Sequence, residues 1–205
     1  MPIAWYALVG LFAALLINRA AECWLSPARL ACGLTRHPRR QWLVTVGMPL
    51  LFAALAGLTT DGRQGVACLF AAVLVLLAVV DLEQRRLPNV VVLPALIAAV
   101  ALSDRPIAAA LVGLAAFAVF WALSALGSRL YGPGALGMGD VKLAALLGAA
   151  LGWPLAAYAM MGGVLLAGGF AAWLLLSGRA GRGALLPYGA FLAAGGIVTL
   201  VVGQF

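Results

Sequence analysis

The sequence predicts an all-α fold, a polytopic bundle of about eight transmembrane helices. The first observation is composition: hydrophobic residues make up 65% of the 205 residues, charged residues make up only 9%, and the mean hydropathy is +1.11. A soluble domain carries charge on about a quarter of its residues. Apolar runs long enough to cross a bilayer are the second observation, and the sorting of basic residues between alternate loops is the third. Soluble enzymes, disulfide-stapled secreted domains and disordered tails are thereby excluded.

Eight apolar segments follow one another along the chain, separated by residues typical of turns. The first is interpreted as a retained helix, because a signal peptide would have basic residues before its apolar core and here Arg19 and Glu22 come after it. Polar or proline-containing breaks end the second to fifth, the sixth is short and glycine-interrupted, and Pro154 divides it from the seventh. The segments are 3–21, 42–59, 65–81, 88–103, 106–127, 140–153, 154–177 and 187–204. We expect one integral membrane domain, 1–205, with a short basic loop at 22–41.

Basic residues are distributed unevenly over this arrangement. Only Arg63 and Arg105 fall on one side, and the other eleven of the thirteen fall on the opposite side. The crowded side is predicted to be cytoplasmic, so both termini are predicted to lie outside. The eleven residues are Arg19, Arg29, Arg36, Arg39, Arg40, Arg85, Arg86, Arg129, Lys142, Arg179 and Arg182. The net charge of +7 therefore needs no nucleic acid, and anionic membrane lipid is the partner expected at the basic face.

The cysteine and histidine pattern predicts no metal site. Cys23 and Cys32 are far apart for a zinc ligand pair, Cys68 lies in an apolar run, and the single histidine, His37, lies in the basic loop. A structural zinc site usually needs four ligands at short spacing.

Two of the six acidic residues, Asp81 and Asp140, lie at the predicted cytoplasmic ends of helices. Taken singly, each could be a cap or an anchor, and Asp is a good N-cap for the helix that follows Asp140. Taken together, two close carboxylates share a proton and can hydrolyse a peptide bond, one as base toward water and the other as acid. Gly137 and Gly139, just before Asp140, would let an extended peptide approach, although the glycines at 132–134 also suit a flexible connector.

These residues resemble a known family. The heptapeptide 137–143, GMGDVKL, looks like the GxGD motif of intramembrane aspartyl proteases, in the type IV prepilin peptidase branch. The stretch 81–89, DLEQRRLPN, resembles that family's first aspartate motif, and 186–192, LPYGAFL, resembles its C-terminal motif, with Tyr188 and Ala190 substituted. The three motifs span roughly residues 70–195 in the family's order.

The resemblance implies a membrane aspartyl endopeptidase with Asp81 and Asp140 as the catalytic dyad. Such an enzyme removes the short basic leader of type IV prepilins and pseudopilins at the cytoplasmic face of the bacterial inner membrane. The mature substrate continues into a hydrophobic helix with a glutamate near its start. Proteolysis needs no cofactor. Many members also N-methylate the new terminus with S-adenosylmethionine, but the loop 22–41 lacks the family's zinc-binding CxxC insert, so this second activity stays open.

Several residues are expected to bind substrate or support the dyad. Lys142 is either a membrane anchor or a partner of a dyad carboxylate or of the substrate glutamate. Glu83 could attract the basic leader, and Arg85 and Arg86 the substrate glutamate, although solvated loop charge is the simpler interpretation. Pro88 and Pro187 are predicted to start helices. The full set is Gly137, Met138, Gly139, Lys142, Glu83, Pro88, Asn89, Pro187, Tyr188 and Gly189.

Two other classes of membrane protein share some of these features. A proton- or cation-coupled transporter also uses intramembrane carboxylates and glycine-broken helices, but its aspartates should lie nearer mid-span, within inverted repeats that this chain does not display. The presenilin branch shares GxGD, but its Tyr-Asp and Pro-Ala-Leu motifs are replaced here by Val80-Asp81 and Pro187-Tyr188-Gly189.

Overall fold

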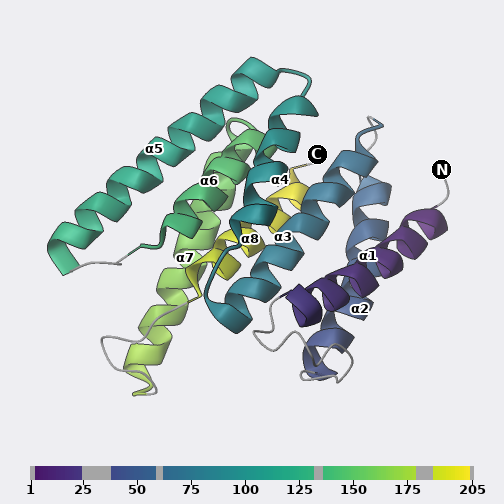
Figure 1. The fold of residues 1–205 in the computed structure, drawn as a ribbon, viewed down its shortest axis with the longest axis horizontal. Helices are drawn as coiled ribbons and strands as arrows, with labels where there is room; N and C mark the ends of the chain where they lie inside the picture. Colours follow the sequence, from purple (N-terminus) through teal and green to yellow (C-terminus); the bar gives the residue numbers. More distant parts are fainter. Residues whose placement is uncertain (1–2, 25–37, 59–61, 132–135, 179–186, 204–205) are drawn as a thin grey trace.

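The structure is a computed structural model that describes residues 3–24, 38–58, 62–131, 136–178 and 187–203. All regular structure in these ranges is helical, which confirms the predicted fold class (Figure 1). The eight helices are α1 (Ile3–Trp24), α2 (Pro38–Leu58), α3 (Gln64–Gln84), α4 (Asn89–Ala101), α5 (Pro106–Tyr131), α6 (Met138–Leu151), α7 (Leu155–Leu176) and α8 (Tyr188–Val202).

Five of these helices, α1, α2, α3, α5 and α7, are long and apolar enough to span a bilayer, and α4 and α8 are shorter apolar helices. The chain is therefore a multi-pass membrane protein. Several predicted boundaries were wrong. Helix α2 begins at Pro38 and so includes the basic residues Arg39 and Arg40 that precede the predicted apolar run, and α5 continues to Tyr131. Hydropathy marks where a segment becomes polar, whereas helical hydrogen bonding continues beyond that point. The predicted loop 22–41 accordingly has helical residues at both ends.

Helix α6 occupies the centre of the bundle. It packs most extensively against α5 and also contacts α4, α7 and α8, while the α1–α2 hairpin lies along α3 (Figure 1). Three of its leucines, Leu143, Leu146 and Leu147, are fully buried. Small residues let the backbones approach, since a Cβ on Gly148 would lie 2.8 Å from the Val112 carbonyl oxygen of α5. The helix that carries Asp140, α6, is thus surrounded by four other helices.

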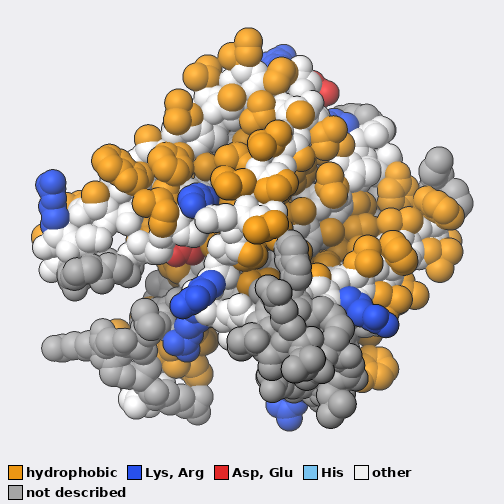
Figure 2. All heavy atoms as spheres, in the orientation of Figure 1, with side chains coloured by type: hydrophobic (Ala, Val, Ile, Leu, Met, Phe, Trp, Pro, Cys, Tyr) orange, Lys and Arg blue, Asp and Glu red, His pale blue; other side chains and the backbone are white. Residues whose placement is uncertain are grey.

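Polar contacts show which helix ends lie together. Arg40, at the start of α2, pairs with Glu83 near the end of α3, and the N–H of Ala190, at the start of α8, donates to Asp81. These helix ends form what we call the Asp81 end. Arg63, before α3, pairs with Asp104 in the α4–α5 turn, and this defines the opposite, Arg63 end. On the face in Figure 2, hydrophobic side chains cover most of the upper and central surface, and Lys and Arg side chains lie both near its edges and in its lower part.

Helices α7 and α8 meet through glycines, which gives a stability prediction. A Cβ on Gly195 would lie 2.2 Å from the Ala159 carbonyl oxygen, so Gly195→Ala must push the two helices apart. Overpacking of this kind costs about 2 kcal/mol, and we expect a lower free energy of unfolding in mixed micelles. Gly168→Ala, on α7 where a Cβ meets nothing within 4 Å, is the control and should be neutral or slightly stabilising. Equal stability of the two variants would contradict this packing.

Candidate active site

Asp81 lies in the last turn of α3 and its side chain is buried, with 5% exposure. The helix ends because Arg85 adopts a left-handed backbone with φ of 54°, and the Arg85 N–H donates to the Asp81 carbonyl oxygen at 2.8 Å. Pro88 then caps the start of α4, as predicted. Asp81 is therefore carried by the last turn of a helix, and Pro88 and Asn89 begin the next one.

The Asp81 carboxylate caps another helix. Pro187 is the N-cap of α8, confirming the predicted helix start, but it provides no side-chain cap for the first turn. Instead the Ala190 N–H donates to Asp81 Oδ2 at 2.9 Å, and Gly189 lies directly against the same carboxylate. The N-terminal turn of a helix presents unpaired N–H groups and partial positive charge, so it stabilises an anion there. This contact fixes the carboxylate between α3 and α8.

Asp140 is the third residue of α6. The N-cap is Gly137, with an extended backbone, so the alternative interpretation of Asp140 as the N-cap is not what the structure has. The Asp140 N–H donates to the Gly137 carbonyl oxygen at 3.0 Å, and the Asp140 carboxylate turns back toward Gly137, where a Cβ would lie 3.2 Å from Oδ2. An acidic side chain that reaches back to the N-cap N–H is one half of a capping box. Gly139 is helical, and its missing side chain makes room for Leu87, 3.1 Å from a Cβ built there.

The carboxylates of Asp81 and Asp140 both lie against Gly189. A Cβ built on Gly189 would lie 3.1 Å from Asp81 Cγ and also 3.1 Å from Asp140 Oδ1. The two side chains are therefore within about 6 Å of each other, close enough for each to affect the ionisation of the other. The dyad comes from α3 and α6 and is assembled against the first turn of α8.

A pocket of about 340 Å³ opens beside the two aspartates at the Asp81 end. Two arginines and a lysine give its wall positive charge, and the glycine motif supplies accessible backbone. The lining residues are Asp81, Arg85, Arg86, Leu87, Asn89, Gly137, Met138, Gly139, Asp140 and Lys142. Besides the two aspartates, six of the predicted site residues meet here. Five of them line the pocket, namely Gly137, Met138, Gly139, Lys142 and Asn89. The sixth, Gly189, lies against the dyad. Tyr188 is close enough to Asp140 to interact with it electrostatically.

Lys142 has a contact that differs from the expected ones. Its Nζ donates to Asn89 Oδ1 at 2.9 Å, which links the N-terminal part of α6 to the first residue of α4. Both residues line the pocket, so the link positions its wall. Leu87 is a site residue that pattern reasoning missed, although it lies inside the DLEQRRLPN stretch. From the α3–α4 connection, its side chain packs against the positions of both Gly139 and Gly189.

Glu83 lies in α3, so its assignment to a loop was wrong. Arg40 Nη1 donates to Glu83 Oε1 at 2.6 Å and to Oε2 at 2.8 Å. Both side chains are mostly shielded, at 11% and 23% exposure. This contact holds the start of α2 to the end of α3, two residues beyond Asp81. No feature of the sequence indicated Arg40.

The Arg40–Glu83 pair is expected to contribute measurably to stability. A double-mutant cycle with Arg40→Gln and Glu83→Gln should give a coupling free energy of about 1 kcal/mol, since partly shielded pairs with two short contacts lie at the upper end for ion pairs near a surface. Chemical unfolding in mixed micelles measures it. Strictly additive effects of the two substitutions would show that the pair adds nothing.

The other candidate groups lie apart from this site. Among the residues that the structure describes, no cluster of three or more His, Cys, Asp or Glu side chains could hold a metal. Cys68 is buried in α3. The predictions for Cys32 and His37 fall outside the described residues, as do those for the side chains of Glu22 and Cys23.

Comparison with known proteins gives one family and several named relatives. Residues 68–176 match the type IV leader peptidase family. A protein of Aeromonas salmonicida (strain A449) named prepilin leader peptidase/N-methyltransferase is 31% identical over 168 residues, covering 79% of this chain and 58% of that protein. Proteins of the same name from Burkholderia pseudomallei (strain 1026b) and Bacillus subtilis (strain 168) are 32% and 34% identical, over 75% and 67% of this chain and 52% and 56% of their own lengths. The chain therefore spans less than two thirds of these relatives. No solved structure matches.

Proposed function

We propose, from the premise that the chain belongs to the type IV leader peptidase family, that it is a membrane aspartyl endopeptidase that removes the leader from prepilins or pseudopilins. The observation that carries this proposal is the meeting of Asp81 and Asp140 against Gly189, beside a pocket open at one end of the bundle. Two carboxylates at that distance are the machinery of proteolysis without a covalent intermediate.

The hydrogen bonds suggest separate roles for the two aspartates. Asp81 accepts a hydrogen bond from the Ala190 N–H in the first turn of α8, a contact that favours its carboxylate form. We assign the base to Asp81 and the acid to Asp140. Asp81 takes a proton from water while the water oxygen bonds to the peptide carbonyl carbon, and Asp140 gives its proton to the carbonyl oxygen. When the C–N bond breaks, the proton on Asp81 passes to the leaving amine, and Asp140 regains its proton from the collapsing diol.

The site is proposed to lie at the cytoplasmic face of the bacterial inner membrane, with both chain termini outside. The basis is the positive-inside rule applied to the eleven basic residues of that side. Arg85 and Arg86 line the pocket and would attract the glutamate near the start of the mature substrate, while the leader would lie toward the cytoplasm. Anionic lipid at the basic face is part of the same proposal.

The two aspartates also discriminate against the transporter alternative. A coupling site of that kind is expected near mid-span. Asp81 and Asp140 instead lie in the last turn of α3 and the first turn of α6, at the same end of the bundle. No observation favours transport.

The test is a cleavage assay with the full chain in detergent micelles. A synthetic prepilin N-terminal peptide is incubated with the protein, and product masses are recorded with and without S-adenosylmethionine. Loss of the leader mass supports the peptidase, whereas an intact peptide under conditions in which a relative cleaves it would overturn the proposal. An additional methyl mass on the product would show that the chain also N-methylates it, the second activity in the relatives' names. We propose that the proteolytic step itself needs no cofactor.

A further inference from the structure

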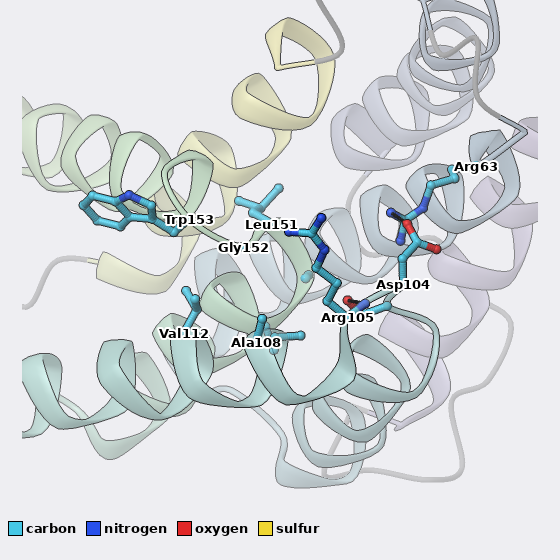
Figure 3. Close-up of a pocket in the computed structure, with 12 residues that line it drawn as sticks. Arg63, Asp104, Arg105, Ala108, Val112, Leu151, Gly152 and Trp153 are labelled. Carbon is cyan, nitrogen blue, oxygen red and sulfur yellow. Dashed lines mark hydrogen bonds and ion pairs between the residues drawn. The ribbon is translucent and has the colours of Figure 1, made fainter.

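A second pocket, of about 530 Å³, lies at the Arg63 end, the end opposite the two aspartates (Figure 3). Its wall is formed where the start of α3, the α4–α5 turn and the α6–α7 turn come together. The lining residues are Arg63, Ser103, Asp104, Arg105, Ala108, Ala109, Val112, Ala149, Ala150, Leu151, Gly152 and Trp153. None of them belongs to the proposed peptidase site, so this pocket needs its own explanation.

The polar part of the wall carries one uncompensated positive charge among the described residues. Arg63 is held by its ion pair with Asp104 and by a hydrogen bond from Nη2 to the Leu102 carbonyl oxygen at 3.4 Å. Arg105 has no carboxylate partner within the described part of the chain, and Figure 3 shows its side chain extending into the pocket. Ser103 Oγ accepts a hydrogen bond from the Arg105 backbone N–H at 3.2 Å, which leaves its own proton to donate. Arg105 and Ser103 together suit a phosphate oxygen.

The rest of the wall is apolar and follows the membrane-spanning helices. Ala108 and Val112 on α5 face the pocket together with Ala149 and Leu151 on α6. Trp153, 76% exposed in the α6–α7 turn, has the position of an interfacial aromatic anchor. A second apolar pocket between α4, α5 and α6 shares Ala149 with this one, so the apolar surface continues deeper into the bundle. The site therefore has a charged part at the membrane boundary and a hydrocarbon-like part along the helices.

We propose that this pocket binds one anionic phospholipid. Its phosphate would bind Arg105 and Ser103, and an acyl chain would lie over Ala108, Val112 and Ala149. A free phosphate would bind only the polar half of the pocket, whereas a phospholipid would fill both the polar and the apolar half. A pocket with both kinds of wall therefore favours a lipid. This inference does not depend on the peptidase proposal, because the pocket lies at the other end of the bundle.

The test is a titration of the full-length protein, followed by native mass spectrometry, with dioleoyl phosphatidylglycerol, dioleoyl phosphatidylcholine or inorganic phosphate. We expect a one-to-one adduct with phosphatidylglycerol and weaker binding of phosphatidylcholine. Arg105→Gln should weaken phosphatidylglycerol binding by about tenfold, the effect of losing one charge-assisted hydrogen bond. Arg129→Gln is the matched control, because it removes the same charge from the exposed last turn of α5, at the Asp81 end.

A second variant tests the apolar half independently. Ala108→Trp fills the exposed wall of the pocket and leaves Arg105 in place, so it should weaken phosphatidylglycerol binding without changing the response to inorganic phosphate. Equal effects of Arg105→Gln and Arg129→Gln would overturn the site, as would phosphatidylcholine binding as tightly as phosphatidylglycerol. If inorganic phosphate at low concentration displaces the lipid fully, the pocket binds phosphate alone, and the lipid assignment is overturned.

Discussion

Replacing Asp140 by Asn abolishes leader cleavage in a protein that remains folded: this is the largest effect expected. Asn has the shape of Asp and fits the same space beside Gly137, so the first turn of α6 keeps its packing. It has no carboxylic proton to give to the peptide carbonyl. Removing one member of an acid–base pair costs about a thousandfold in turnover, and the rate of leader release by mass spectrometry measures it.

Asp81→Asn should lose the same activity and Asp81→Ala should lose stability as well. Asn still accepts the Ala190 N–H hydrogen bond, whereas Ala leaves the first turn of α8 without its acceptor. Loss of a helix cap costs about 1 kcal/mol, and more where the N–H is buried. Comparing the two variants separates chemistry from capping, because only the alanine variant should lower the unfolding midpoint in detergent.

Asp104→Asn is the matched control for these substitutions. It makes the same acid-to-amide change at the Arg63 end, where Asp104 pairs with Arg63, and it should leave cleavage at the wild-type rate. The dyad assignment fails if Asp140→Asn or Asp81→Asn retains more than a tenth of the wild-type turnover while its fold is intact.

The membrane fold and both aspartates could be predicted because they depend on local sequence. Hydropathy identifies a spanning helix whatever its neighbours are. A carboxylate such as Asp81 at the end of an apolar run costs free energy, so its presence there indicates a functional role. The GxGD heptapeptide could also be recognised, because its residues are consecutive. Helix ends were less accurate: α2 begins at Pro38, where backbone hydrogen bonding continues into the polar residues.

The contacts that build the site could not be predicted, because they join residues far apart in the chain. Asp81 accepts from Ala190 across 109 positions, and Arg40 donates to Glu83 across 43. Neither pairing leaves a periodic or local pattern. The use of Asp81 as a cap for α8 follows only when packing brings the end of α3 to the unpaired N–H groups of that helix. Charge reasoning therefore offered Glu83 as a contact for the basic leader or as a solvated loop charge, whereas its carboxylate pairs with Arg40 within the bundle.

The shape of the site depends on one position without a side chain. Gly189 stands where a Cβ would lie 3.0 Å from Leu87 and 3.1 Å from an atom of each aspartate. Contacts this short require a neighbour to move. Leu87 also meets the position of Gly139, so it has little room to give way, and the carboxylates must move instead. Glycine at this position therefore keeps the distance between Asp81 and Asp140.

Gly189→Ala is accordingly expected to reduce the turnover of the prepilin peptide by about a hundredfold, because displacement of reacting groups by a fraction of an ångström to 1 Å has effects of that size. The KM for the peptide should change little, since the substitution alters the dyad and leaves Arg85 and Arg86 at the pocket wall. Initial rates over a range of peptide concentrations separate the two constants. Gly168→Ala, a helical glycine with open space around it, should cleave at the wild-type rate. If Gly189→Ala is as active as Gly168→Ala, the close approach at Gly189 does not set the geometry of the dyad, and the site tolerates a wider separation of its carboxylates.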